Sequence, residues 1–299
     1  MNIQNKEKFI AWLSDYHRKL RRKKFEKRGI TVSRIPLHNF FHNRLVPVIR
    51  VLRKMRRQKL VILGDKRQLG KSPVIYTVTH IGGNDVEIAF EAIKEPACLF
   101  LGDPKELYCN FDGLMLALNG VICVETRDKF DRQIARRKAV ELLKKGGNLI
   151  IYPEGAWNIS DNLPVLPIYA GALEMAVEAQ ADIVPVAIEV YGNTYYVNIG
   201  DNLSWMEINL MEKSETALQL RDRMATLKWD EFETQGIHSR ESIPYGYRRE
   251  FVDRIMNAKA TSYVEQDVYD GMYRPKGVTE PEEVFRAIKN LRVDKRKGI

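Results

Sequence analysis

Residues 74–93 read VIYTVTHIGGNDVEIAFEAI, a short apolar run followed by a glycine turn and a second apolar segment. The run Val74–Val78 predicts a buried strand, and Val86–Ile93 predicts a helix behind it. Between them His80 stands five positions before Asp85, and the two intervening glycines let the chain fold back so that the carboxylate can orient the imidazole ring. A histidine that ends a strand is also often a hydrogen-bonded structural residue. The stretch therefore predicts a strand–turn–helix unit that carries a candidate His–Asp pair.

The alternation of apolar runs with amphipathic stretches continues along the chain and predicts a layered α/β fold. The other expected strands are 98–101, 121–124, 149–152 and 183–188, and the other expected helices are 114–118, 130–143 and 173–179. We expect a largely parallel or mixed sheet flanked by helices. The site should lie at the carboxyl ends of the strands, where His80 and the segment 152–155 would converge.

Three later segments follow the His–Asp pair in a characteristic order. They are GVICVETR at 120–127, YPEGA at 152–156 and IVPVAI at 183–188. This order resembles the lysophosphatidic acid acyltransferase (1-acylglycerol-3-phosphate O-acyltransferase) family, whose blocks are His-x4-Asp, Gly-x-x-Phe-x-x-Arg, Phe-Pro-Glu-Gly-Thr and an apolar Val-Pro strand. Lys105-Glu106-Leu107 also resembles a Lys-Glu-Leu that the family often carries between its first two blocks.

The second and third blocks depart from the family pattern. Cys123 replaces the phenylalanine of the second block, and an extra residue puts Thr126 at the arginine position and Arg127 one place later. In the third block Ala156 replaces threonine. The departures fall where the family holds its acceptor, so they leave the acceptor more open than the type of reaction.

The resemblance implies acyl transfer from a thioester donor, acyl-CoA or acyl carrier protein, to a hydroxyl of a lysophospholipid such as 1-acylglycerol-3-phosphate. His80 would be the general base, and Asp85 would fix its tautomer and stabilise the imidazolium. No side-chain nucleophile, metal or other cofactor is expected. An acyltransferase acting on a glycolipid or another lysolipid is the alternative within this class.

Four further residues are candidates for substrate binding. Lys105 and Arg127 would hold the acceptor phosphate. Glu154 would either hold acceptor hydroxyls or fix its loop, and backbone amides near Gly155 would receive the developing oxyanion. The structural alternatives are a residue at a helix start for Glu154 and a surface turn for Arg127.

The positive charge is concentrated at the amino end of the chain. Residues 1–71 hold 21 Lys or Arg and four Asp or Glu, which gives them a net charge of +17. The whole chain carries +9, so the other 228 residues carry −8. Apolar positions Phe9, Trp12 and Tyr16 follow helical spacing, and Phe40–Ile49 precedes six basic residues. Two amphipathic basic helices would suit an anionic membrane surface. Packing on the main domain and binding of nucleic acid by a non-catalytic protein are the alternatives.

The remaining chain gives fewer signals. We divide the whole chain into a helical membrane-association segment at 1–59, an acyltransferase core at 60–204 and a mostly helical extension at 205–299 packed on the core. Within this extension Ile208–Lys228 predicts one long amphipathic helix and Val284–Leu291 a short one. The three cysteines have no metal-ligand spacing, and no uninterrupted apolar run approaches the roughly 20 residues of a membrane span. We therefore expect a cytoplasmic protein held peripherally on the inner face of the cell membrane.

Overall fold

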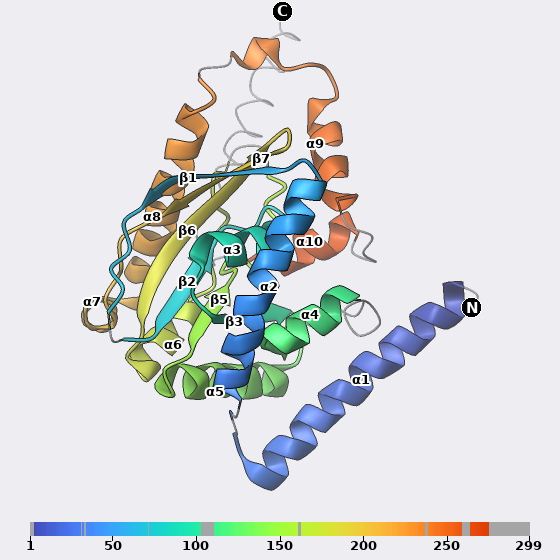
Figure 1. The fold of residues 1–299 in the computed structure, drawn as a ribbon, viewed down its shortest axis with the longest axis vertical. Helices are drawn as coiled ribbons and strands as arrows, with labels where there is room; N and C mark the ends of the chain where they lie inside the picture. The colour runs from blue at the N-terminus through green and yellow to red at the C-terminus, as the bar shows by residue number, and fades with distance from the viewer. Residues whose placement is uncertain are drawn as a thin grey trace, which may run out of the picture.

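The expected strand Val74–Val78 forms β2, near the middle of a seven-stranded sheet in the computed structural model (Figure 1). The structure describes residues 3–274, apart from positions 31, 33, 71, 103–110, 161–162, 237–238 and 259–263. Across the sheet the strands are β1 (Lys59–Asp65), β7 (Thr194–Ile199), β6 (Asp182–Tyr191), β2, β5 (Asn148–Ile151), β3 (Ala97–Gly102) and β4 (Val121–Val124). Neighbouring strands are parallel except β6 and β7, which form an antiparallel pair. The predicted layered α/β fold is confirmed.

Two apolar cores cover the two faces of the sheet because successive side chains of each strand point to opposite sides. Val74, Tyr76 and Val78 join the core beneath α2 (Ile35–Met55) and α3 (Asp85–Ile93). Ile75 joins the other core, with α5 (Lys129–Lys144), α6 (Gly171–Ala179) and part of α8 (Lys213–Glu233). Burial on both faces explains why the central strands read as continuous apolar runs.

Two strands, β1 and β7, were not predicted from the sequence. β1 forms one edge of the sheet and pairs in parallel with β7, which itself follows β6 through a tight turn at Gly192 and Asn193. Residues 191–196 carry a usable signal, since a Gly-Asn pair between aromatic and β-branched residues is typical of a hairpin. β1 gives a weaker signal because most of its residues are exposed.

The amino-terminal segment forms the two expected helices, α1 (Ile3–Arg28) and α2. α1 projects from the body of the molecule (Figure 1), and its carboxyl-terminal half is held to α5 by an ion pair from Arg21 to the buried Asp131. α2 instead packs against α3 and β3, and Arg53 of α2 forms an ion pair with the buried Glu91 of α3. Within the described residues, no helix is both long and apolar enough to cross a membrane.

The carboxyl-terminal region contains α7 (Trp205–Leu210), α8, a short 3₁₀ helix at Arg240–Ser242, α9 (Tyr247–Met256) and α10 (Glu265–Gly271). The prediction of one helix over Ile208–Lys228 is wrong, because the backbone is extended at Met211 and Glu212. Ser204 and Glu207 form a capping box that starts the first helix earlier. The break lets Ile208 and Leu220 both enter the same core. The predicted helix Val284–Leu291 lies outside the described residues.

α4 (Phe111–Asn119) follows β3 and packs against α2, which also contacts α3. The predicted helices at 114–118, 130–143 and 173–179 correspond to α4, α5 and α6, each slightly longer than expected. The expected ranges are shorter because several of the end residues, such as Asp112, Asn119 and Gly171, are polar or glycine and do not add to the apolar periodicity.

Candidate active site

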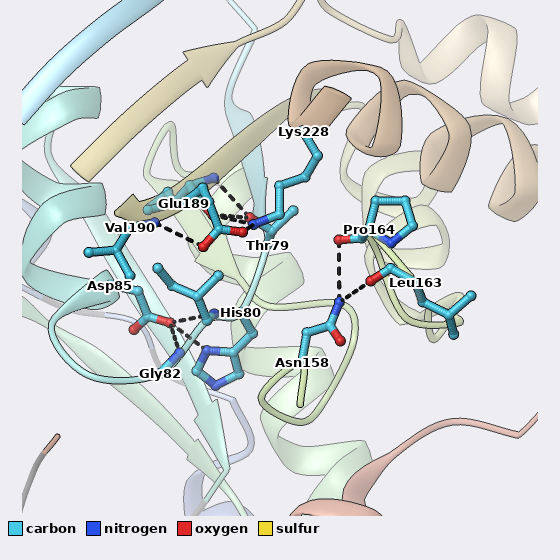
Figure 2. Close-up of polar contacts among 12 residues, drawn as sticks. Thr79, His80, Gly82, Asp85, Asn158, Leu163, Pro164, Glu189, Val190 and Lys228 are labelled. Atoms are coloured by element: carbon cyan, nitrogen blue, oxygen red, sulfur yellow. Dashed lines mark hydrogen bonds and ion pairs between the residues drawn. The ribbon is translucent and has the colours of Figure 1, made fainter. Parts of the chain in front are cut away.

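His80 follows β2 at its carboxyl end, and its ring is held by Asp85 (Figure 2). The distance from the imidazole Nδ1 to Asp85 Oδ2 is 2.7 Å. The same oxygen accepts hydrogen bonds from the backbone amides of Ile81 (3.1 Å) and Gly82 (2.9 Å). With Nδ1 donating to the carboxylate, Nε2 carries the lone pair and can accept a proton. The pairing predicted from the sequence is therefore present with the geometry of a general base and its orienting carboxylate.

The turn that brings these residues together depends on glycine. Gly82 and Gly83 have φ values of 76° and 63°, a conformation that side chains rarely tolerate. A Cβ at Gly82 would also lie 3.0 Å from a methyl carbon of Ile255 and 3.2 Å from the ring of Trp157. The turn is thus folded back as predicted and is covered by α9 of the carboxyl-terminal region.

Glu154 lies behind the turn and is fully buried. Its Oε1 accepts the backbone amide of His80 at 2.8 Å, and its Oε2 accepts that of Leu166 at 2.8 Å. Burial raises the pKa of Glu154 to about 7, against the opposing effects of the two backbone hydrogen bonds and the positive charge of Lys228. Because both oxygens are occupied by the main chain, the structure favours the loop-fixing role over contact with acceptor hydroxyls.

Tyr152 replaces the phenylalanine of the third block and packs on the His80 ring. Its ring centroid lies 4.2 Å from that of His80, with an angle of 31° between the planes. The Tyr152 hydroxyl is buried and has no hydrogen-bond partner within the described structure. Burial, together with the nearby charge of Asp85, raises the pKa of this phenol well above its ordinary value. The Tyr152 ring can restrict the motion of the His80 imidazole, and the Tyr152 hydroxyl makes no hydrogen bond in the described structure.

The Gly155 amide itself is engaged within the turn, which leaves the prediction that backbone amides near Gly155 receive the oxyanion to the other amides of this segment. The Gly155 N–H donates to the carbonyl of Tyr152 at 3.1 Å, so it is already used within the turn. Gly155 has φ of 72°, and a Cβ there would meet the Tyr169 ring at 2.6 Å and the carbonyl oxygen of Gly271 at 3.2 Å. Close packing of α10 and Tyr169 thus accounts for this glycine.

Arg127, one of the two predicted phosphate ligands, is not brought to His80 in the structure. Arg127 is 76% exposed, pairs with Asp270 at 3.2 Å and lies at a shallow depression with Arg18, Glu125, Asp128 and Lys129. This depression shares no lining residue with the larger cavity that adjoins the turn after His80. Asp128 caps α5 through its side chain, which matches the surface-turn alternative for this segment. Lys105 lies outside the described residues.

A buried ion pair that was not predicted from the sequence lies beside the turn and is visible above His80 in Figure 2. Lys228 of α8 donates to Glu189 Oε2 at 2.7 Å and to the carbonyl of Ile188 at 2.7 Å. A signal existed, since Lys228 and Glu231 occupy the helical spacing set by the buried Leu220 and Met224. A charged residue at an apolar position of an amphipathic helix indicates a buried partner.

Comparison with known proteins agrees with this arrangement. The acyltransferase family profile matches residues 43–189, which include the His–Asp turn, Glu154 and most of β6. Residues 43–189 belong to the acyltransferase family. The chain is 28% identical over 141 residues to the 1-acyl-sn-glycerol-3-phosphate acyltransferase of Borreliella burgdorferi, covering 47% of this chain and 55% of that protein. It is 25% identical over 139 residues to the enzyme of the same name from Saccharomyces cerevisiae, covering 46% and 45%.

The fold of this chain is also found in a solved structure. The crystal structure of the 1-acyl-sn-glycerophosphate acyltransferase from Thermotoga maritima matches with a TM-score of 0.55 at 14% identity, covering 78% of this chain and 99% of that one. The chain spans about half the length of the curated relatives that it matches. The residues matched by the family profile end before α8, α9 and α10, and α9 covers the glycine turn through Ile255.

Proposed function

We propose that this protein is an O-acyltransferase that moves an acyl chain from a thioester donor to a hydroxyl of a lysophospholipid such as 1-acylglycerol-3-phosphate. The observation that carries the proposal is the 2.7 Å contact between His80 Nδ1 and Asp85 Oδ2 at the carboxyl end of β2. Membership of the acyltransferase family and the names of its relatives support the reaction class and the acceptor.

The mechanism uses the chain's own groups for proton transfer. His80 Nε2 removes the proton of the acceptor hydroxyl as its oxygen attacks the thioester carbonyl carbon. A C–O bond forms and a tetrahedral oxyanion develops, and Asp85 stabilises the imidazolium. When the C–S bond breaks, the imidazolium returns the proton to the leaving thiolate. Glu154 keeps the backbone of His80 in place during these steps.

The test is an assay of the purified protein with acyl-CoA and with acyl carrier protein thioesters. Each donor is offered to 1-acylglycerol-3-phosphate, to other lysophospholipids and to a glycolipid, and products are identified by mass spectrometry. Formation of the diacyl product by the wild type but not by His80→Ala supports the proposal. No product with any combination would refute it, and transfer only to the glycolipid would replace the acceptor.

The proposal includes attachment to an anionic membrane surface through α1. Phe9, Trp12 and Tyr16 are each about half exposed, and their rings stack in sequence along one face of the helix. Exposed aromatic rings on a basic helix are typical of interfacial binding. α2 contributes differently, because Arg53 and Arg56 are engaged by acidic residues of α3. The same pairing leaves fewer free cations for nucleic acid, the rival partner.

Deleting residues 1–28 would be an ambiguous test, because it would also remove Arg21 and leave the buried Asp131 without this ion pair. A triple variant that changes Phe9, Trp12 and Tyr16 to serine avoids this difficulty. It should sediment less with vesicles of anionic phospholipid than the wild type, whereas Tyr245→Ser, which removes another exposed aromatic ring, should not. Unchanged sedimentation of the triple variant would show that this face does not bind the membrane.

A further inference from the structure

β2 and β6 pair in parallel, and their main-chain ladder ends one residue before His80. Its last main-chain bond in the described structure runs from the Thr79 N–H to the Val186 carbonyl, at 3.0 Å. The His80 main chain then leaves the sheet, since its N–H donates to Glu154 and its carbonyl accepts from the Asn158 N–H. The direction in which the imidazole leaves β2 therefore depends on how Thr79 is fixed.

The Thr79 side chain takes the next place in this ladder. Its Oγ1 accepts a hydrogen bond from the Ile188 N–H at 2.9 Å and donates to the Ile188 carbonyl at 3.2 Å. A hydroxyl can make both bonds because it carries one donor and two acceptor sites. Thr79 and Ile188 are both buried, so removal of the hydroxyl would leave the Ile188 N–H without this acceptor and out of reach of water.

α8 binds the same carbonyl from the carboxyl-terminal region. The Lys228 ammonium donates to the Ile188 carbonyl at 2.7 Å, and Thr79 lies beside the end of the Lys228 side chain in Figure 2. The Ile188 oxygen therefore accepts from two side chains, one on each side of β6 in the sequence. Lys228 lies beyond residues 43–189, the part of the chain that matches the family profile. A series of hydrogen bonds thus connects α8 to the residue directly before the base.

We propose that Thr79 is a positioning residue for the reaction and that its hydroxyl sets the orientation of the His80 ring. The inference rests on the proposed acyltransferase function and adds to it a residue that acts only through His80. Held at Ile188, the hydroxyl fixes the end of β2, and the chain then enters the glycine turn in the direction that places Nδ1 on Asp85. Without the hydroxyl the strand end can shift, and a misplacement of about 1 Å lowers a rate by up to about 100-fold.

Thr79→Val tests the hydroxyl, because valine keeps the shape of threonine and removes both bonds to Ile188. It should lower kcat by about 10- to 100-fold while the KM of each substrate stays near the wild-type value, since the base is displaced and the groups that bind substrate are not. Thr79→Ser keeps the hydroxyl and should recover most of the loss. Equal losses of kcat in the valine and serine variants would overturn the proposal.

Thr77→Val is the matched control, two positions earlier on β2. Thr77 is also fully buried, but its hydroxyl has no hydrogen-bond partner within the described structure. This variant should therefore keep the kcat and KM of the wild type. If Thr79→Val does not fold, Thr79→Cys takes its place, because a thiol of similar size is only a weak donor and acceptor. Wild-type kcat in folded Thr79→Val or Thr79→Cys would exclude the positioning role and leave the acyltransferase function intact.

The His80 ring gives a second readout that needs no acyl transfer. NMR of protein labelled with ¹⁵N-histidine reports which ring nitrogen carries the proton, and the signal lost in His80→Ala assigns the resonance. Below the melting temperature of every variant, the wild type, Thr79→Ser and Thr77→Val should share the tautomer protonated at Nδ1, and Thr79→Val should show a mixture. An unchanged tautomer in Thr79→Val would reject the positioning role. A mixture in Thr79→Val, when the wild type transfers no acyl group, would support that role and reject the proposed function.

Discussion

The backbone amide of His80 donates to Oε1 of Glu154 at 2.8 Å, so the residue before the glycine turn is tied to the residue that follows the Tyr152-Pro153 pair. The other oxygen of Glu154 holds the amide of Leu166, twelve positions along the chain. One buried carboxyl thus fixes both the strand that carries the base and the loop beside it. The backbone N–H of Asn158 forms a second link by donating to the backbone carbonyl of His80 at 2.7 Å.

The buried carboxyl of Glu154 should make stability depend on pH. Its pKa is raised from 4.5 to about 7 by burial, so the folded state holds this proton more tightly than the unfolded chain does. The stabilisation it confers is complete below pH 4.5 and is lost as the pH rises through about 7. The loss amounts to at most about 3 kcal/mol. Urea unfolding at several pH values should show the wild type losing stability relative to Glu154→Gln, which does not titrate. A constant difference between the two proteins across this range would contradict the prediction.

His80→Ala should lower kcat by about 10²- to 10⁴-fold while the protein remains folded, because it removes a positioned general base. Asp85→Asn should lower kcat and also the melting temperature, since one Asp85 oxygen serves the His80 ring and two backbone amides. Asn84→Ala is the control within the same turn, because the Asn84 side chain does not cap α3. Steady-state kinetics and circular dichroism separate the two effects. Near wild-type kcat in folded His80→Ala would exclude the mechanism.

Tyr152→Phe should leave kcat nearly unchanged and stabilise the protein slightly, by up to about 1 kcal/mol, because it removes a buried hydroxyl without a partner. The stacked ring on His80 remains in this variant. Tyr76→Phe is the matched comparison, since the Tyr76 hydroxyl donates to Glu95 at 2.6 Å and its loss should cost about 1–3 kcal/mol. Thermal unfolding measures both changes. A large loss of kcat in Tyr152→Phe would instead give the hydroxyl a part in the reaction.

Lys228→Met should destabilise the fold by about 3 kcal/mol, because it leaves Glu189 without its partner in a largely buried position. The double variant Lys228→Met/Glu189→Leu should recover much of this loss, as replacement of both charges removes the uncompensated carboxylate. A double-mutant cycle in urea gives the coupling. Additive effects of the two substitutions would show that the pair contributes no coupling energy.

The central strands and the His–Asp pair could be predicted because their signals are local. Val74–Val78 is apolar along its whole length, and the spacing of His80 and Asp85 sits within one turn. Lys228 could not be placed in the same way, because its partner Glu189 lies 39 positions away and the contact depends on the packing of α8. The same limit applies to Arg127, whose position in a motif-like segment does not reveal that its side chain faces Asp270.

The break between α7 and α8 shows a different limit. Apolar periodicity runs through Ile208 and Leu220 and gives no sign that the helix axis changes between them. Only the capping pattern at Ser204 and Glu207 fixes where the first helix begins. Cap residues and apolar spacing have to be read together to place such a break.

The edge strand β1 also has a consequence for biosynthesis. Lys59 of β1 pairs with Thr194 of β7, a residue that the ribosome adds 135 positions later. Until β7 emerges, the main-chain groups of β1 have no neighbour in the sheet, although the strands from β2 to β5 can already associate. Assembly of this edge is therefore a late event in folding, and a nascent chain stalled before residue 194 would present an unpaired strand to chaperones or to other chains.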